Sequence, residues 1–244
     1  MPTLPHATNL RQTAVIPRST PRRENPCRAC PLLREALLLD HAECGLATMA
    51  ALDSLLLPDD TLLAEAGTSI THLHLIRSGL VALMRDLPDG SRRILRLLKP
   101  GDIIGLEGLT GAPQPHRAVA LRESALCRVP VGAVQEAADA SPAFARRLLD
   151  HWRTALERAD MVILDFGHGS ARQRVARLLL FLAAPSDGRC ATFRRGDMAA
   201  VLDLAPETVS RVLTGFQRGG ILVKRDPNHF QADRAALRAE AELP

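Results

Sequence analysis

A pair of short helices predicted between residues 196 and 218 constrains the fold of this chain most. The first helix, Gly196–Leu202, stops near Asp203. Pro206 then begins the second helix, at a position where the missing N–H of proline costs no hydrogen bond. Gly219-Gly220 ends that second helix. Two short helices joined by so tight a turn predict a helix-turn-helix.

The second helix has two separate faces. Its apolar side chains recur at helical spacing and predict a buried stripe: Val209, Val212, Leu213 and Phe216. The opposite stripe is polar: Glu207, Ser210, Arg211, Thr214 and Arg218. Arg can donate two hydrogen bonds to guanine, and Glu can accept one from the amino group of cytosine. We therefore interpret the second helix as a recognition helix for the DNA major groove.

The residues around this helix pair extend the same interpretation. Ile221–Arg225 and His229–Gln231 predict a β-hairpin, the wing of a winged helix-turn-helix, with Lys224 placed for a DNA phosphate. Asp233 is expected to cap a last helix. Residues 171–225 hold ten Arg or Lys against four Asp or Glu, an excess of +6 in a chain of formal net charge +4. This concentrated positive charge favours double-stranded DNA as a partner.

Composition excludes several classes of protein. The 244 residues are 46% hydrophobic and only 3% aromatic, which fits a globular protein with an aliphatic core. No apolar run reaches the roughly 18 residues of a membrane span, and the N-terminus lacks the apolar region of a signal peptide, so we expect a cytoplasmic protein without a membrane partner. The Gly-rich, Gly-x-Ser-x-Gly and His-Glu-x-x-His motifs of common enzymes are missing, so we expect no enzymatic activity.

Short apolar runs alternate with turns between Leu55 and Pro130. Glycines recur there every 11 or 12 residues, at Gly67, Gly79, Gly90 and Gly101. This spacing predicts an antiparallel β-barrel or roll with strands near His72–Arg77, Leu80–Asp86 and Arg92–Leu98. Asp89-Gly90 predicts a two-residue hairpin turn with positive φ at both positions.

A long helix is predicted from Pro142 to Phe166. Apolar side chains recur along it at spacings of 4, 3, 4, 3 and 4, as in a two-stranded coiled coil: Leu148, Trp152, Ala155, Ala159, Val162 and Phe166. We expect this seam to pair with the same helix of a second chain, forming a homodimer. Asp160 lies beside the seam, where two approaching carboxylates would repel each other and keep the dimer marginal.

These elements predict an α+β protein in four parts. Residues 1–26 are expected to form a flexible N-terminal arm, and residues 27–140 an antiparallel β-roll that carries cysteines and acts as a sensor. Residues 141–167 form the dimerisation helix, and residues 168–244 the winged helix-turn-helix domain.

The cysteines leave three readings open. Cys27 and Cys30 form a Cys-x-x-Cys pair, Cys44 follows, and Cys127 lies on the last roll strand; four thiolates are the usual ligand set of a [4Fe–4S] cluster. Alternatively, Cys27, Cys30 and Cys44 could hold zinc together with His41. In the third reading Cys127 is a buried core residue and the others carry no metal. Cys190 lies apart from these residues and is interpreted as structural.

The chain resembles the CRP/FNR family of regulators. The resemblance rests on Arg195-Gly196-Asp197-Met198, Leu202, Leu204, Glu207-Thr208-Val209-Ser210-Arg211 and Phe216-Gln217, and on the order of roll, long helix and helix-turn-helix over about residues 46–235. It implies a cyclic-nucleotide-binding-like roll, a homodimer, and RNA polymerase as a further partner. One departure is Ala205-Pro206, where a Thr or Ser would normally cap the recognition helix.

Within that family the chain is most similar to the oxygen-sensing FNR branch. The resemblance implies that Glu207, Ser210 and Arg211 read a TTGAT-like half-site repeated as a palindrome. The candidate DNA contacts are Arg195, Glu207, Thr208, Ser210, Arg211, Thr214 and Lys224. It also assigns Cys27, Cys30, Cys44 and Cys127 to a [4Fe–4S] cluster that oxygen or nitric oxide destroys. The stretch from Cys30 to Cys44 is longer than in the familiar sensors, but loop-closure cost grows slowly with length.

A small-molecule effector is the remaining alternative. The CRP branch binds cyclic AMP in its roll through a Glu and an Arg before the last strand, and Glu107 and Arg117 fall near those places. The residues that surround this Glu and Arg in the CRP branch are missing, however, because the chain reads Gly105-Leu106-Glu107-Gly108 and His116-Arg117-Ala118-Val119. The loop between them is broken by proline and contains no aromatic residue, which makes it a poor phosphate cradle.

Overall fold

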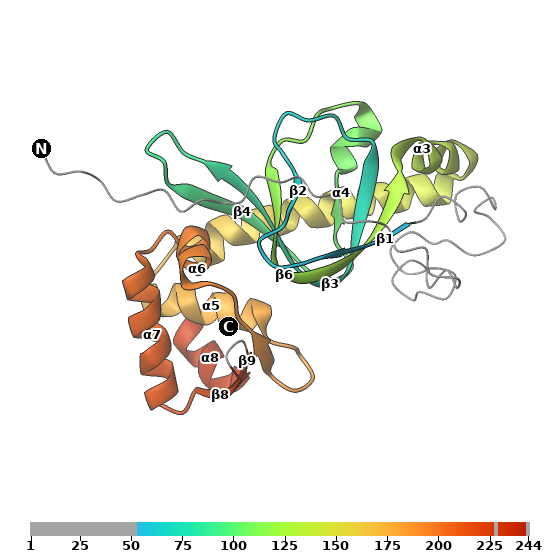
Figure 1. Ribbon diagram of the computed structural model, residues 1–244. Helices are drawn as coiled ribbons and strands as arrows, with labels where there is room; N and C mark the ends of the chain where they lie inside the picture. The colour runs from blue at the N-terminus through green and yellow to red at the C-terminus, as the bar shows by residue number, and fades with distance from the viewer. Residues whose placement is uncertain (1–52, 227–228, 243–244) are drawn as a thin grey trace, which may run out of the picture.

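The computed structural model describes residues 53–226 and 229–242 of the chain. The expected N-terminal arm and the candidate ligands Cys27, Cys30, His41 and Cys44 lie outside the described residues. The described chain forms a β-roll (residues 53–130), a long helix that runs along the roll, and a C-terminal head (residues 171–241) of four helices and a small sheet (Figure 1). The expected α+β architecture is confirmed.

The roll is antiparallel throughout. Its strands are β1 (Asp53–Leu57), β2 (Leu62–Ala64), β3 (His72–Asp86), β4 (Arg92–Leu98), β5 (Ile103–Ile104) and β6 (Arg117–Pro130), with the short helix η2 (Leu106–Thr110) between the last two. They pair in the order β1-β6-β3-β4, while β2 adds to β6 and β5 adds to β3. The roll interior is filled by aliphatic residues such as Leu57, Ile76 and Leu126.

Strand β3 corrects one sequence expectation. It continues through Gly79, where the sequence predicted a break between two strands. Gly79 has φ +96°, and a Cβ there would lie 2.2 Å from the Ser124 hydroxyl oxygen of β6. The pairing of β3 with β6 shifts register around this point. Gly79 therefore marks a β-bulge inside a continuous strand, a role that glycine spacing does not distinguish from a turn.

The hairpin between β3 and β4 is confirmed, but its predicted turn type is wrong. Gly90 has φ +80°, whereas Asp89 is not among the residues with positive φ. The Gly90 N–H donates to the Leu87 carbonyl at 2.9 Å, and the Leu87 N–H donates to the Ser91 carbonyl at 2.8 Å. This pattern is that of a three-residue loop with a left-handed glycine.

Helix α3 (Val131–Ala140) follows the roll and leads into α4 (Pro142–Met161), which continues as a single π-helical segment, η3 (Val162–Phe166). The Ser141 hydroxyl caps α4 by accepting from the Phe144 N–H at 3.3 Å, and Pro142 occupies the first turn. Phe144 and Leu148 pack beneath the helix against β3 and β6.

The structure corrects the expected seam of this long helix. Leu148 and Phe166 are buried inside the chain itself, and Val162 is half-buried there, so they offer little surface to a partner. A helix that covers a domain shows the same apolar periodicity as a coiled-coil seam. The exposed apolar residues lie on the neighbouring stripe, which we call the α4 stripe: Leu149, Trp152, Leu156, Ile163 and Leu164. Trp152 is the one member of the predicted seam that also belongs to this stripe.

The head begins with α5 (Ala171–Leu182), capped by a reciprocal pair of hydrogen bonds between Ser170 and Gln173. It continues with β7 (Arg189–Ala191), α6 (Arg195–Leu202), α7 (Pro206–Arg218), β8 (Leu222–Asp226), β9 (His229–Ala232) and α8 (Arg234–Ala241). The strands form a sheet in the order β7-β9-β8. The Asp233 carboxylate caps α8 through the Ala236 N–H at 3.0 Å, as the sequence predicted.

The head packs against the outer face of the roll. Met84, Ile94 and Leu97 of the roll belong to the same buried cluster as the core of the head. Ion pairs join Arg93 to Asp203 and Arg194 to Asp60 across this junction. Within the described part of the chain, none of the helices has the length and apolar character needed to cross a bilayer.

Candidate nucleic-acid interface

The turn between α6 and α7 is held by the backbone. Asp203 ends α6 with φ +54°, and the Leu204 N–H donates to the Ala199 carbonyl at 3.2 Å. Ala205 precedes α7 without a side-chain cap, and the Thr208 N–H donates instead to the Ala205 carbonyl at 3.0 Å. The geometry is that of a helix-turn-helix whose second helix lacks the usual capping hydroxyl.

One side of α7 is anchored in the head. Val209, Leu213 and Phe216 are at most 1% exposed and pack with residues of α5 and α6. The Arg172 guanidinium lies 4.5 Å from the centre of the Phe216 ring and also pairs with Glu240 of α8. These contacts fix the rotation of α7 about its own axis, which decides the side chains that it presents outward.

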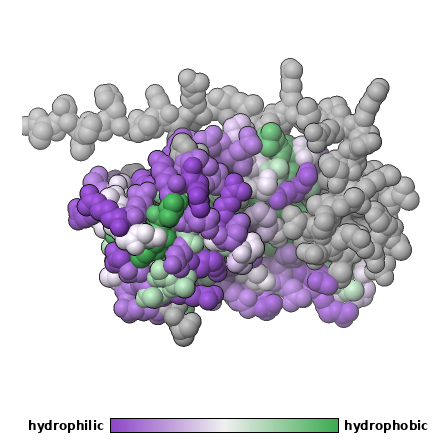
Figure 2. Space-filling view, turned by 90° about the horizontal axis from the view of Figure 1, so that it is seen from below, coloured by the Kyte–Doolittle hydropathy of each residue, from purple (hydrophilic) through white to green (hydrophobic). Residues whose placement is uncertain are grey.

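The opposite side of α7 faces solvent. All five predicted polar residues are exposed, and we call them the α7 stripe: Glu207, Ser210, Arg211, Thr214 and Arg218. The Thr214 hydroxyl donates to the Ser210 carbonyl at 2.9 Å, so its proton is used within the helix. Figure 2 shows the molecule from below as largely hydrophilic, with small apolar patches. The α7 stripe thus places side chains that can hydrogen-bond base edges on an open, rigid surface.

Two further candidate contacts occupy less open positions. Thr208 is half-buried on α7. Arg195 is half-buried at the start of α6, where burial lowers the pKa of its guanidinium below its ordinary value and its Nη1 donates to the Met198 sulfur at 3.5 Å. Arg195 therefore lies on α6, apart from the exposed surface of α7. That surface holds the remaining candidates on α7: Glu207, Ser210, Arg211 and Thr214.

The wing is formed by β8 and β9. Lys224 and Arg225 are exposed on β8, while Phe230 of β9 is buried and fixes the hairpin to the head. His229 Nδ1 lies 2.9 Å from both carboxylate oxygens of Asp226 near the tip. Lys224 thus lies on the predicted wing, separate from the α7 stripe, as a phosphate contact requires.

The cysteines on described residues lie in two different cores. Cys127 of β6 is fully buried among apolar residues of β3, α3 and α4, including Leu75, Val134 and Phe144. Cys190 is buried in the head; its thiol donates to the Leu179 carbonyl at 3.7 Å, and burial raises its pKa to about 12. A thiol with so high a pKa is unreactive at neutral pH, in keeping with a structural role. The described residues contain no cluster of three or more potential metal ligands.

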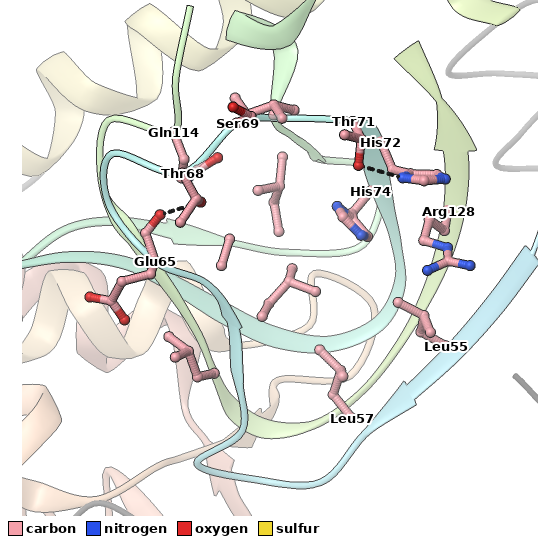
Figure 3. Close-up of a pocket in the computed structure, with 16 residues that line it drawn as sticks. Leu55, Leu57, Glu65, Thr68, Ser69, Thr71, His72, His74, Gln114 and Arg128 are labelled. Carbon is pink, nitrogen blue, oxygen red and sulfur yellow. Dashed lines mark hydrogen bonds between the residues drawn. The ribbon is translucent and has the colours of Figure 1, made fainter. Parts of the chain in front are cut away.

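The two residues considered for cyclic AMP are placed unfavourably for that role. Arg117 lies at the start of β6, where Glu65 is 3.3 Å from its Nε and Asp86 is 3.1 Å from its Nη1. Glu107 lies on η2. Neither lines the cavity of about 330 Å³ inside the roll (Figure 3). Two carboxylates of the same chain therefore already pair with the guanidinium that a phosphate would need.

Comparison with known proteins identifies both parts of this structure. Residues 55–141 match the profile of the cyclic nucleotide-binding domain, and residues 173–240 match the Crp-like helix-turn-helix domain. The chain belongs to the CRP/FNR family of transcription regulators.

Relatives of this CRP/FNR regulator include the anaerobic regulatory protein of Haemophilus influenzae, which is 27% identical over 167 residues. That match spans 66% of the present chain and 65% of the relative's length. Another is the transcriptional activator protein FnrA of Stutzerimonas stutzeri, 27% identical over 213 residues, with 82% of this chain and 86% of FnrA covered.

Solved structures agree with the family. FixK2 of Bradyrhizobium japonicum superposes with a TM-score of 0.68 at 26% identity, covering 76% of this chain and 95% of FixK2. A CRP-family transcriptional regulator of Thermus thermophilus gives a TM-score of 0.66 at 25% identity, covering 78% and 97% of the two chains. The resemblance to the CRP/FNR family that the sequence motifs indicated is therefore confirmed.

Proposed function

We propose that this CRP/FNR regulator binds DNA as a homodimer and reads a TTGAT-like palindrome through the α7 stripe. The exposure of Glu207, Ser210 and Arg211 on one face of an anchored helix carries the proposal. These residues have the hydrogen-bonding groups that discriminate bases in the major groove, and Lys224 on the wing adds a phosphate contact. RNA polymerase is the further partner proposed for the bound regulator.

The α4 stripe supports the homodimer. Leu149, Leu156 and Ile163 are 68%, 64% and 70% exposed, a large apolar surface for one helix of a single chain. Their spacings of seven residues match one register of a coiled-coil seam. A dimer is what a palindromic site requires, because each half-site takes one recognition helix.

We further propose that a [4Fe–4S] cluster held by Cys27, Cys30, Cys44 and Cys127 gates this dimer. When bound, such a cluster supplies an oxygen- and nitric oxide-labile link between the four thiolates. Cys127 suits the role of remote ligand in one respect, because it belongs to the same group of buried apolar residues as Phe144 and Leu148 of α4. A displacement of Cys127 would therefore shift the packing of the helix that carries the α4 stripe.

The burial of Cys127 also supports a second candidate, a zinc site made of Cys27, Cys30, His41 and Cys44. That site needs no remote ligand, so Cys127 would remain a core residue among apolar neighbours. The two candidates differ in the role of one thiol, which makes Cys127 the residue to substitute.

Anaerobic purification followed by absorption spectroscopy and iron, sulfide and zinc analysis tests these proposals. We expect a brown protein with about four irons per chain that bleaches in air, and loss of this iron in Cys127→Ser. Cys190→Ser is the matched control, since Cys190 is equally buried but lies in the head. A colourless protein that binds one zinc, with the same zinc content in Cys127→Ser, would contradict the cluster and favour the zinc site. Salt-dependent binding to a duplex carrying the palindrome tests the DNA proposal separately.

A further inference from the structure

Helix α8 carries no candidate DNA contact, yet one side chain connects it to the recognition helix α7. Helix α5 contacts both α7 and α8 (Figure 1). Arg172, in the first turn of α5, lies over the Phe216 ring of α7 and also pairs with Glu240 of α8. Between described residues, no ion pair joins α7 directly to another element. The Arg172 guanidinium is therefore the charged group that holds α7 from outside.

The position of this guanidinium is set by α8. Its Nε donates to Glu240 Oε2 at 2.5 Å, and its Nη2 donates to Glu240 Oε1 at 2.5 Å. A two-point pair of this kind fixes the plane of the guanidinium as well as its place. The remaining nitrogen, Nη1, lies beside α7, since a Cβ added at Gly215 would be 3.5 Å from it. The Glu240 carboxylate thus decides where the guanidinium meets α7.

Glu240 projects from a firm support. Leu237 and Ala241 on the same helix are fully buried in the core of the head. Arg177 of α5 donates from Nε to the Ala241 carbonyl at 3.1 Å and from Nη1 to the His168 carbonyl at 2.8 Å. The last turn of α8 is therefore tied to α5 and to the segment that joins η3 to α5.

Base reading and phosphate contacts tolerate movement of α7 to different degrees. Hydrogen bonds to base edges require side chains within about 0.5 Å of the productive geometry. The attraction between a cation and a phosphate falls only slowly with distance. The buried stripe of α7 makes apolar contacts, which have no preferred direction. A directional contact narrows the orientation of α7 further, and its loss lowers base discrimination more than total affinity for DNA.

We propose that Arg172 and Glu240 are positioning residues for base recognition, because their pair sets the orientation of α7 and thereby its discrimination between base sequences. This role rests on the proposed function of the α7 stripe, and it makes α8 part of DNA recognition without a contact to DNA. The Arg172 and Glu240 side chains are 46% and 26% exposed, and exposed ion pairs contribute little to stability. Loss of the pair therefore changes discrimination more than it changes the unfolding temperature.

Fluorescence anisotropy with the anaerobically purified full chain tests this role. The probes are the palindromic duplex and a duplex in which the guanine of each half-site is replaced, and the ratio of the two Kd values measures discrimination. We expect Arg172→Lys and Glu240→Gln each to lower this ratio by about fivefold, and the double variant to lower it no further, because both remove the same contact. The unfolding temperature of each variant should change little.

Glu242→Gln is the matched control, because it makes the same substitution two residues later at an exposed position, and its ratio should equal that of the unsubstituted chain. An unchanged ratio in Glu240→Gln would overturn the positioning role, even where Arg172→Lys fails to fold. Equal weakening on both duplexes with a lower salt dependence in Arg172→Lys would also overturn it and make Arg172 a phosphate contact. An unsubstituted chain that binds both duplexes alike would contradict base reading itself, which separates the two failures.

Discussion

Helices α4 and α7 are both anchored by one apolar face, but their outer faces differ. On α7 the outer face is polar, with Glu207, Ser210 and Arg211 open to solvent. On α4 the outer face carries exposed Leu149 and Leu156, and exposed Ile163 follows on its continuation η3. A polar face with Arg suits base edges in a DNA groove, whereas an aliphatic face gains free energy only by meeting another apolar surface. The contrast supports the proposal that the α7 stripe meets DNA and the α4 stripe meets a second chain.

The largest expected effect comes from placing a charge on the α4 stripe. Leu156→Glu would bring two carboxylates together in the dimer and remove two buried leucines, so we expect dimer affinity to fall by about 100-fold or more. Analytical ultracentrifugation measures the change. Ala143→Glu puts the same charge on an exposed position of α4 outside the stripe and should leave the dimer intact. An unaltered dimer in Leu156→Glu would move the interface away from α4.

Arg211 and Lys224 test the two kinds of DNA contact. Arg211→Ala should cost about 1–3 kcal/mol at one guanine of the half-site and relax discrimination there. Lys224→Ala should weaken binding to all duplexes alike and reduce the salt dependence, because it removes a phosphate contact. Fluorescence anisotropy with matched and single-substitution duplexes measures both. Equal loss on every duplex for Arg211→Ala would remove Arg211 from the base-reading set.

Asp160 tests whether charge repulsion weakens pairing along α4. It is exposed and lies four residues from both Leu156 and Leu164, so it is on the same face of the helix as the α4 stripe. Asp160→Ala should remove the repulsion between two carboxylates and raise dimer affinity by about tenfold in protein without metal. Sedimentation of the metal-free protein measures this. Asp150→Ala, outside the stripe, is the control, and no rise in dimer content would contradict the repulsion.

The smallest effect is expected at the start of α7. Ala205 has φ −70° and ψ 142° but no side chain that can cap the helix. Ala205→Ser should stabilise the head by about 0.5–1 kcal/mol, because the hydroxyl can accept from a free N–H of the first turn. Thermal unfolding measures the gain, and Ala205→Gly should gain about a few tenths of a kcal/mol less, because glycine is also a favourable N-cap residue. A loss of stability in Ala205→Ser would mean that the turn excludes the capping rotamer.

Much of the fold follows from local sequence. The elements with strong local signals lie close to their predicted places: α7 between Pro206 and Gly219, the cap at Asp233, and strand β4. Proline, glycine and capping carboxylates act on the residues next to them in the chain, so their effect can be predicted without knowledge of tertiary contacts. The two stripes of α7 were predictable for the same reason, since helical periodicity fixes which residues share a face.

Other features needed the tertiary structure. Two adjacent apolar stripes run along α4, and only the position of the roll decides that Leu148 is buried while Leu149 is exposed. Gly79 could only be recognised as a bulge once Ser124 of β6 lay against it. The cavity at His74 and Arg128 joins residues 54 positions apart through strand pairing. The sequence by itself determined which helices have two faces, and tertiary packing decided which face each one buries, because burial depends on partners distant in the chain.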